Sequence, residues 1–232
     1  MRVYKTAIEA ESEIRRDLKS FGTLITTNTM QNMNIKENPD YHTHELTNYG
    51  YVILEPSYDD IISLPNINIE YCDAELCDRI NGMRGRPTNP GNSWLINKEL
   101  WEPMLVNGKM DYTYSERMVG LADHIVKILR KDKNNRRCWW PIFSPKDIIA
   151  MKEKELVRVP CSLGYNFQIR DNKLMITYIM RSCDFITHWA NDVFFACALQ
   201  GIIANRLDIK VGSFTHFMFS LHVYQKDVKE VF

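Results

Sequence analysis

The sequence predicts a single domain of the α/β or α+β class, because strand-like and helix-like segments are interleaved and no linker-like break separates them. The chain has 232 residues, 45% of them hydrophobic, which is enough for one sizeable core. Charged residues make up 25% of the chain, a composition typical of folded rather than disordered proteins. We therefore expect one domain over residues 1–232.

The charge balance excludes some classes of partner. Lys plus Arg and Asp plus Glu number 29 each, so no net charge attracts nucleic acid or an anionic membrane. No apolar run approaches the ~20 residues of a membrane span, and the N-terminus lacks the apolar stretch of a signal peptide. Six cysteines are too few for a disulfide scaffold in a chain of this length. We expect a soluble protein of the reducing cytoplasm, with neither nucleic-acid nor membrane partners.

Four segments make up the expected N-terminal half. Residues 6–20 have the amphipathic period of a helix that ends near Gly22. Residues 23–55 are rich in Thr, Asn and short β-type stretches, so strands and loops are expected. A second helix is expected from about Pro65 toward Gly82. Residues 84–94 (RGRPTNPGNSW) are rich in turn formers and predict a mobile loop.

The expected C-terminal half alternates helices and strands. Helical spacing predicts one helix over residues 115–131, with a buried face of Met118, Leu121, Ile125, Ile128 and Leu129. RRCWWPIF (136–143) predicts a strand, and residues 171–173 separate two β-type runs as in a hairpin. An apolar helix is expected over residues 188–207. Residues 213–224 predict a long strand, with Phe217, Phe219, Leu221 and Val223 on one face and His216, Ser220, His222 and Tyr224 on the other.

Cys161 is the candidate nucleophile. It follows Pro160 and precedes a predicted strand. A lone cysteine is more often a buried apolar thiol, so the local sequence leaves both interpretations open. Cys72 and Cys77 lack a second cysteine pair and a nearby His, so no zinc site is expected.

Two arginine motifs are candidates for binding phosphate. Arg136 and Arg137 lie between a predicted helix and a strand, and Arg181 with Ser182 ends a β-type run. Guanidinium groups clamp phosphate bidentately, and a hydroxyl can complete the clamp. A solvated helix end for the first motif and an ion pair with Asp184 for the second are the alternatives that the local sequence leaves open.

Two further pairs of polar residues could contact a ligand. His222 and Tyr224 share one face of a strand and could hold a sugar hydroxyl, although a histidine satisfied within the core is the commoner case. Asn191 and Asp192 lie at the start of an apolar helix, which either could simply cap.

In this order, the motifs resemble those of thymidylate synthases and their pyrimidine-hydroxymethylating relatives. The similarity runs from about residue 112 to Tyr224, roughly half of the chain. It comprises Tyr114 in DYTYSER, the arginines of NNRR, Cys161 in VPCS, RSCD (181–184), an Asn-type position in the next helix, and SLHVY. The resemblance implies a large mixed sheet covered by helices and a homodimer formed sheet to sheet.

The resemblance also implies a mechanism. Cys161 would attack C6 of a pyrimidine nucleotide, and C5 would then attack the methylene group of 5,10-methylenetetrahydrofolate. Arg181 and Ser182 would hold the 5′-phosphate, with Arg136 and Arg137 reaching across from the neighbouring subunit. His222 and Tyr224 would contact the ribose, and Tyr114 would assist removal of the C5 proton.

The departures from the synthases point to cytosine. Ser162 stands where synthases have His, Met180 where they have Gln, and Asp192 where they have the Asn that reads the base. A carboxylate accepts from the N4 amine of cytosine and, with a shared proton, satisfies N3, whereas it opposes O4 of uracil. Unpaired polar groups in a closed pocket cost about 1–3 kcal/mol. The Met-Arg-Ser and Asn-Asp combination resembles the phage deoxycytidylate hydroxymethylase branch, with Asn191 beside Asp192, so the expected substrate is dCMP.

The catalytic glutamate and the folate contacts are marked less directly. Glu75 follows Tyr71 by four residues and precedes Leu76, which resembles the hydroxymethylase pattern for the glutamate that organises water and proton transfer, and Glu70 is the alternative. Trp101 and Asp184 would contact the folate, with an ordinary core position for Trp101 as the open alternative. The segment TTNTM (26–30) lacks the arginine that synthases use for phosphate, so none of its residues is assigned.

The product depends on whether water reaches the transferred carbon. Water addition gives 5-hydroxymethyl-dCMP and tetrahydrofolate, and hydride transfer gives a methylated nucleotide and dihydrofolate. Synthases seal the site with a C-terminal extension, whereas this chain ends eight residues after Tyr224, so hydroxymethylation is expected. Methylation of dCMP or dUMP is the alternative. A non-catalytic nucleotide-binding protein is the third candidate, opposed by the presence of Cys161 with both arginine motifs.

Overall fold

The computed structural model describes residues 1–81, 96 and 98–232 of the chain, so Gly82 and the loop expected over residues 84–94 lie outside the described residues. The helices are α1 (Ala7–Phe21), α2 (Tyr58–Ile62), α3 (Ile69–Asn81), α5 (Lys98–Trp101), α6 (Tyr114–Met118), α7 (Leu121–Lys131), α8 (Pro145–Glu153) and α9 (Trp189–Leu207). The strands are β1 (Arg2–Tyr4), β2 (Thr23–Ile25), β3 (Thr29–Met30), β4 (Met33–Asn34), β5 (Thr43–Ile53), β6 (Trp139–Pro141), β7 (Ser162–Arg170), β8 (Lys173–Met180), β9 (Cys183–Asp184) and β10 (Lys210–Tyr224). Short 3₁₀ helices span Pro39–Tyr41, Glu102–Met104 and Gln225–Glu230.

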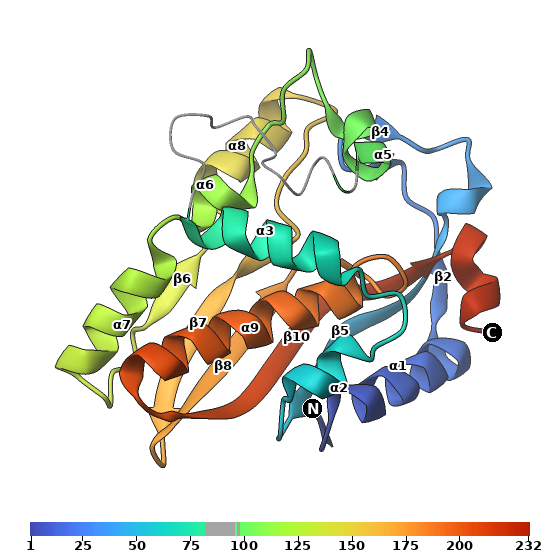
Figure 1. The fold of residues 1–232 in the computed structure, drawn as a ribbon. Helices are drawn as coiled ribbons and strands as arrows, with labels where there is room; N and C mark the ends of the chain where they lie inside the picture. The colour runs from blue at the N-terminus through green and yellow to red at the C-terminus, as the bar shows by residue number, and fades with distance from the viewer. Residues whose placement is uncertain (82–95, 97) are drawn as a thin grey trace.

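A mixed sheet of eight strands is the centre of the fold (Figure 1). Its main order is β1-β5-β10-β8-β7-β6, with β2 paired to β5 and β9 paired to β10. β10 runs antiparallel to β5 and parallel to β8, while β7 runs antiparallel to both of its neighbours. The expected large mixed sheet covered by helices is therefore confirmed.

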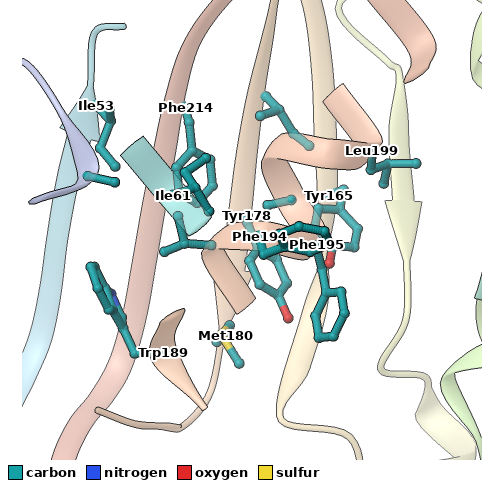
Figure 2. Packing of buried hydrophobic residues seen from close by; sticks show 14 of the residues in the cluster. Ile53, Ile61, Tyr165, Tyr178, Met180, Trp189, Phe194, Phe195, Leu199 and Phe214 are labelled. Atoms are coloured by element: carbon teal, nitrogen blue, oxygen red, sulfur yellow. The ribbon is translucent and has the colours of Figure 1, made fainter. Parts of the chain in front are cut away.

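Helix α9 packs across the middle of the sheet, against β8 and β10, with α2, α3 and α7 beside it (Figure 1). Its sequence is apolar on nearly every side, as is usual for a helix enclosed by a sheet and other helices. Figure 2 shows Phe194 and Phe195 of α9 next to Tyr165 and Tyr178 of the sheet. Each buried aromatic or aliphatic side chain contributes about 1.5–3 kcal/mol of transfer free energy.

The predicted hairpin is confirmed. β7 and β8 are antiparallel, and the pair nearest the turn is Arg170 with Lys173. Asp171 and Asn172 form the connecting turn. Both residues have positive φ angles, 50° and 56°. Asp and Asn tolerate this conformation better than other residues with side chains, which is why they form two-residue hairpin turns.

Two helices differ from the expectation. The single helix expected over residues 115–131 is broken into α6 and α7 at Gly120, whose φ of 76° is left-handed, and Ile128 is 39% exposed rather than buried. The helix expected from about Pro65 begins at Ile69. Asn68 accounts for that start, because its side chain accepts a hydrogen bond from the backbone N–H of Tyr71 at 3.0 Å.

The long strand β10 has the two faces that were expected, but the apolar one is not uniformly buried. His216 and Met218 are fully buried beneath the helices, whereas Phe219 is 45% exposed on the other face. Among the helices of the described part of the chain, none is long and apolar enough to cross a membrane.

Candidate functional site

A cavity of about 490 Å³ lies where β8 ends, α9 begins and β10 approaches its C-terminal end. The β3–β4 hairpin, α5 and the residues before β7 complete its walls. Most of the predicted site residues line it: Trp101, Tyr114, Cys161, Arg181, Ser182, Asp184, Asn191, Asp192, His222 and Tyr224. The fold therefore gathers motifs that are more than 100 residues apart in the sequence.

Cys161 lies immediately before β7 and is partly exposed to the cavity. The side-chain amide of Gln31 donates to Cys161 Sγ at 3.3 Å. Arg181 Nη2 approaches the same sulfur at 3.7 Å. The thiol therefore lies on a cavity wall in contact with two polar side chains, and it is not the fully buried apolar thiol of the alternative interpretation.

Arg181 is fixed by backbone carbonyl groups of the segment before Cys161. Its Nε donates to Pro160 O at 2.9 Å and its Nη2 to Val159 O at 3.1 Å. Asp184, the ion-pair partner of the alternative interpretation, instead accepts from the backbone N–H of Ile186 at 3.1 Å. The guanidinium group is held at the cavity with Ser182 next to it, as a phosphate clamp requires.

Asp192 and Asn191 lie inside the first turn of α9 and not at its N-cap, which is His188. Asp192 is 8% exposed, and it accepts from the Tyr178 hydroxyl at 3.4 Å and from Cys183 Sγ at 3.8 Å. Burial raises the pKa of its carboxyl group to about 6. Near neutral pH this side chain can therefore either accept a hydrogen bond or share a proton.

Asn191 connects α9 to α3. Its Oδ1 accepts from Cys72 Sγ at 3.1 Å and from the backbone N–H of Asn68 at 3.4 Å. These bonds use the carbonyl oxygen of its amide, whereas its Nδ2 donates to Thr187 O at 3.4 Å. Both ends of the Asn191 amide therefore have protein partners, whereas the bonds from Tyr178 and Cys183 to the Asp192 carboxylate are long.

Tyr114 begins α6 and points toward the start of β7. Its hydroxyl oxygen accepts from the Ser162 backbone N–H at 3.4 Å. The Arg79 guanidinium lies 4.2 Å from the centre of the Tyr114 ring and 4.0 Å from the centre of the Phe195 ring, which belongs to α9. Burial raises the pKa of Tyr114, so its phenol is neutral at physiological pH.

Glu75 does not line the main cavity. It is buried and lines a small adjoining cavity with Trp101 and Tyr114, and its carboxylate accepts from Arg79 Nε at 2.7 Å. Glu70, the alternative, is exposed at the start of α3. Arg79, the partner of Glu75 in this ion pair, lines the main cavity. Arg79 was not predicted, although a spacing of four residues between Glu75 and Arg79 is typical of ion pairs on a helix.

His222 and Tyr224 extend from the end of β10 into the cavity, with their rings 5.1 Å apart at 75°. Burial lowers the pKa of His222, so the neutral imidazole, which can both donate and accept, is favoured. Burial raises the pKa of Tyr224. The pair presents neutral hydrogen-bonding groups, as contact with sugar hydroxyls requires.

Arg136 and Arg137 lie outside the cavity. Both are exposed, in the segment that leads into β6. The structure therefore does not bring them to Cys161 within one chain.

Gln31 and Arg158 are two further polar cavity residues that were not predicted. Gln31 belongs to the turn between β3 and β4, next to the TTNTM segment to which no residue was assigned. Arg158 is buried, with its guanidinium 5.1 Å from the Trp101 ring and 4.3 Å from that of Tyr112. An isolated Gln or Arg in a loop carries no local signal, so only the tertiary contacts reveal these two.

The sequence profile of the family described as thymidylate synthase matches residues 88–232, which is more than half of the chain. The chain belongs to the thymidylate synthase family. It is 31% identical over 114 residues to a protein of Methanocaldococcus jannaschii named "Putative thymidylate synthase", covering 49% of this chain and 51% of that protein. It is 28% identical over 111 residues to a thymidylate synthase of Listeria monocytogenes, covering 48% of this chain and 33% of that protein. The chain thus spans about half the length, or less, of these relatives.

Proposed function

We propose that this protein transfers a one-carbon unit from 5,10-methylenetetrahydrofolate to C5 of a cytidine monophosphate, with dCMP as substrate and 5-hydroxymethyl-dCMP as product. The observation that carries the proposal is that Cys161 and Asp192 line the same cavity. One is the nucleophile that the family's chemistry requires, and the other is an acid matched to the amine edge of cytosine. Neither would serve this reaction if they lay apart.

The nucleotide would be anchored at its phosphate and sugar. Arg181 and Ser182 would hold the phosphate, since the guanidinium group is already fixed by the Val159 and Pro160 carbonyls. His222 and Tyr224 would contact the ribose. With both ends of the nucleotide fixed, Cys161 would attack C6 of the ring.

Asp192 would select the base. Its buried carboxyl group accepts from the cytosine N4 amine and, when protonated, donates to N3. A uracil would place O4 against the same acceptor and leave polar groups unpaired, at a cost of about 1–3 kcal/mol. Tyr114 would then assist the loss of the C5 proton, and Glu75 would act through the Arg79 pair and ordered water.

The residues on one wall of the cavity fit a folate. Trp101 lies 6.5 Å from the Tyr71 ring, and Met30, Pro103 and Met104 line the cavity near them, which gives a flat pterin ring an apolar surface. Asp184 lines the same cavity and would contact the folate from the sheet side. When bound, the folate supplies the one-carbon unit.

The proposal includes a homodimer formed through the exposed face of the sheet. Arg136 and Arg137 are exposed near Trp139, which is 40% exposed at the edge of that face. In a dimer of this kind the two arginines would complete the phosphate clamp of the partner.

Two experiments test the reaction. A mixture of 5-fluoro-dCMP and methylenetetrahydrofolate should form a covalent adduct, detected by intact-protein mass, with the wild type but not with Cys161→Ala. Tritium release from C5 should be faster with dCMP than with dUMP, and Asp192→Asn should shift the preference toward dUMP. Absence of the adduct in the wild type would falsify the proposal, and faster release from dUMP would refute the role of Asp192.

Methylation is the second candidate, because the relatives found by comparison bear the name of thymidylate synthases. The combination of Met180 with Asn191 and Asp192 supports hydroxymethylation, since it resembles the hydroxymethylase branch. The mass of the nucleotide product separates the two: a gain of CH₂O indicates hydroxymethylation and a gain of CH₂ indicates methylation.

A further inference from the structure

A row of hydroxyl groups behind the cavity wall joins two residues of the proposed reaction. Ser162 Oγ lies 3.3 Å from the Tyr114 hydroxyl and is also in hydrogen-bond contact with the Tyr178 hydroxyl. Tyr178 donates to Asp192 Oδ1 at 3.4 Å. The four groups come from α6, β7, β8 and α9, so the row exists only in the folded chain.

The two middle members are rigidly held. Ser162 and Tyr178 are 1% and 0% exposed. The Tyr178 ring is stacked between Tyr165, at 4.3 Å and 15°, and His216, at 5.1 Å and 6°. Figure 2 shows the hydroxyl groups of Tyr165 and Tyr178 projecting in the same direction. In such a site the hydroxyl protons can still rotate, and each hydroxyl can donate to one neighbour while it accepts from the other.

Tyr114 needs such a connection. A neutral phenol can accept a proton from carbon only if it releases its own proton at the same time. Burial keeps Tyr114 in this neutral form, because it raises the pKa of the phenol. Asp192, with a pKa of about 6, is a suitable acceptor at the other end.

Two members of the row, Ser162 and Asp192, are departures from the synthases. Ser162 stands where synthases have His after the nucleophile, and Asp192 stands where they have Asn. Tyr178 is the residue that joins the two positions. A single hydrogen-bonded path therefore relates two substitutions that the sequence shows only as separate differences.

We propose that Ser162 and Tyr178 are positioning residues that carry a proton from Tyr114 to Asp192 when C5 loses its hydrogen. The inference deepens the proposed function and rests on it. The C5–H bond breaks, its electron pair stays on the pyrimidine ring, and the proton moves to the Tyr114 oxygen. The proton of Tyr114 passes to Ser162, that of Ser162 to Tyr178, and that of Tyr178 to the Asp192 carboxylate. All three hydroxyl groups are left neutral, and the carboxylate becomes a carboxylic acid.

The test separates attack at C6 from the loss of the C5 proton. Adduct formation with 5-fluoro-dCMP and methylenetetrahydrofolate requires only the earlier steps, because fluorine is not lost as a cation. Tyr178→Phe and Ser162→Ala should therefore form the adduct at the wild-type rate. Tritium release from C5 of dCMP should fall about 100- to 10,000-fold in both variants, the usual contribution of a proton-transfer group.

Tyr165→Phe is the matched control. It removes a buried hydroxyl that is not a member of the row, from the ring stacked on Tyr178. It should form the adduct and release tritium like the wild type. Full release by Tyr178→Phe and Ser162→Ala would overturn the relay, as would loss of the adduct together with release. A wild type with neither adduct nor release would instead overturn the proposed function.

Discussion

At the scale of single residues, Asp192 is an ionisable group enclosed by other polar side chains. Tyr178 and Cys183 hydrogen-bond its carboxylate, and the charges of Arg79 and His188 favour its ionised form. Burial outweighs them and raises its pKa from 3.8 to about 6. Since the folded state binds this proton more tightly than the unfolded state, the carboxyl group stabilises the fold below pH 3.8 and loses that contribution as the pH rises through 6.

We predict that Asp192→Asn becomes more stable relative to the wild type as the pH rises. A shift of about two pKa units corresponds to about 3 kcal/mol, so the free energy of unfolding of the variant should gain up to about this amount on the wild type between pH 4 and pH 7. Urea denaturation at four pH values across this interval measures the difference. A difference that does not change with pH would contradict the raised pKa.

The sequence identified residues with a strong local motif and missed those whose role depends on tertiary contacts. Cys161 and Arg181 were identified because the residues next to them, in VPCS and RSCD, form recognisable motifs, and both side chains line the cavity. Arg79 was missed because the aromatic rings that its guanidinium contacts, those of Tyr114 and Phe195, belong to other helices. No pattern within α3 distinguishes a guanidinium that enters a cavity from one that faces water.

At the scale of elements, the chain's turns were predicted where the turn residues are distinctive. The Asp171–Asn172 turn was predicted because these residues accept positive φ. The break between α6 and α7 was missed because Met118 and Leu121 both face the core, so the apolar period continues across the single left-handed Gly120. Periodicity reports which residues are buried, and it does not report whether the backbone between them stays helical.

Gly164 is the glycine that lets β6 lie close to β7. It adjoins the irregularity in the β7–β8 register, between Ser162 and Gly164. A Cβ at this position would lie 2.5 Å from Trp140 O and 2.5 Å from the Trp139 ring. β6 and β7 can therefore approach each other only over a residue without a side chain.

We predict that Gly164→Ala lowers the free energy of unfolding by about 1–3 kcal/mol, the usual cost of overpacking, because one of the two clashing atoms is backbone and cannot rotate away. Urea denaturation measures the change. Gly201→Ala is the control: it lies inside α9, and a Cβ there meets no atom of the described residues within 4 Å, so it should be neutral or stabilising by up to about 1 kcal/mol. Equal effects of the two substitutions would argue against the close approach of β6.

At the scale of the whole molecule, the two faces of the sheet differ. Tyr165, Tyr178 and His216 are fully buried beneath the helices. Residues that alternate with them, such as Asn166, Thr177 and Phe217, are only partly covered, and Phe219 is 45% exposed. A second copy of the chain on this face would cover Phe219 and would bring Arg136 and Arg137, absent from their own cavity, near another one.

The proposed sharing of the site between subunits predicts complementation. Cys161→Ala and the double variant Arg136→Ala/Arg137→Ala should each release almost no tritium from dCMP. Mixed in equal amounts and allowed to exchange subunits, they should recover about a quarter of wild-type activity, since half of the dimers are mixed and each mixed dimer has one intact site. Cys161→Ala mixed with Arg181→Ala should recover nothing, because Arg181 and Cys161 line the same cavity of one chain and no mixed site contains both. Recovery in neither mixture, with both proteins folded and dimeric, would place Arg136 and Arg137 outside the partner's site.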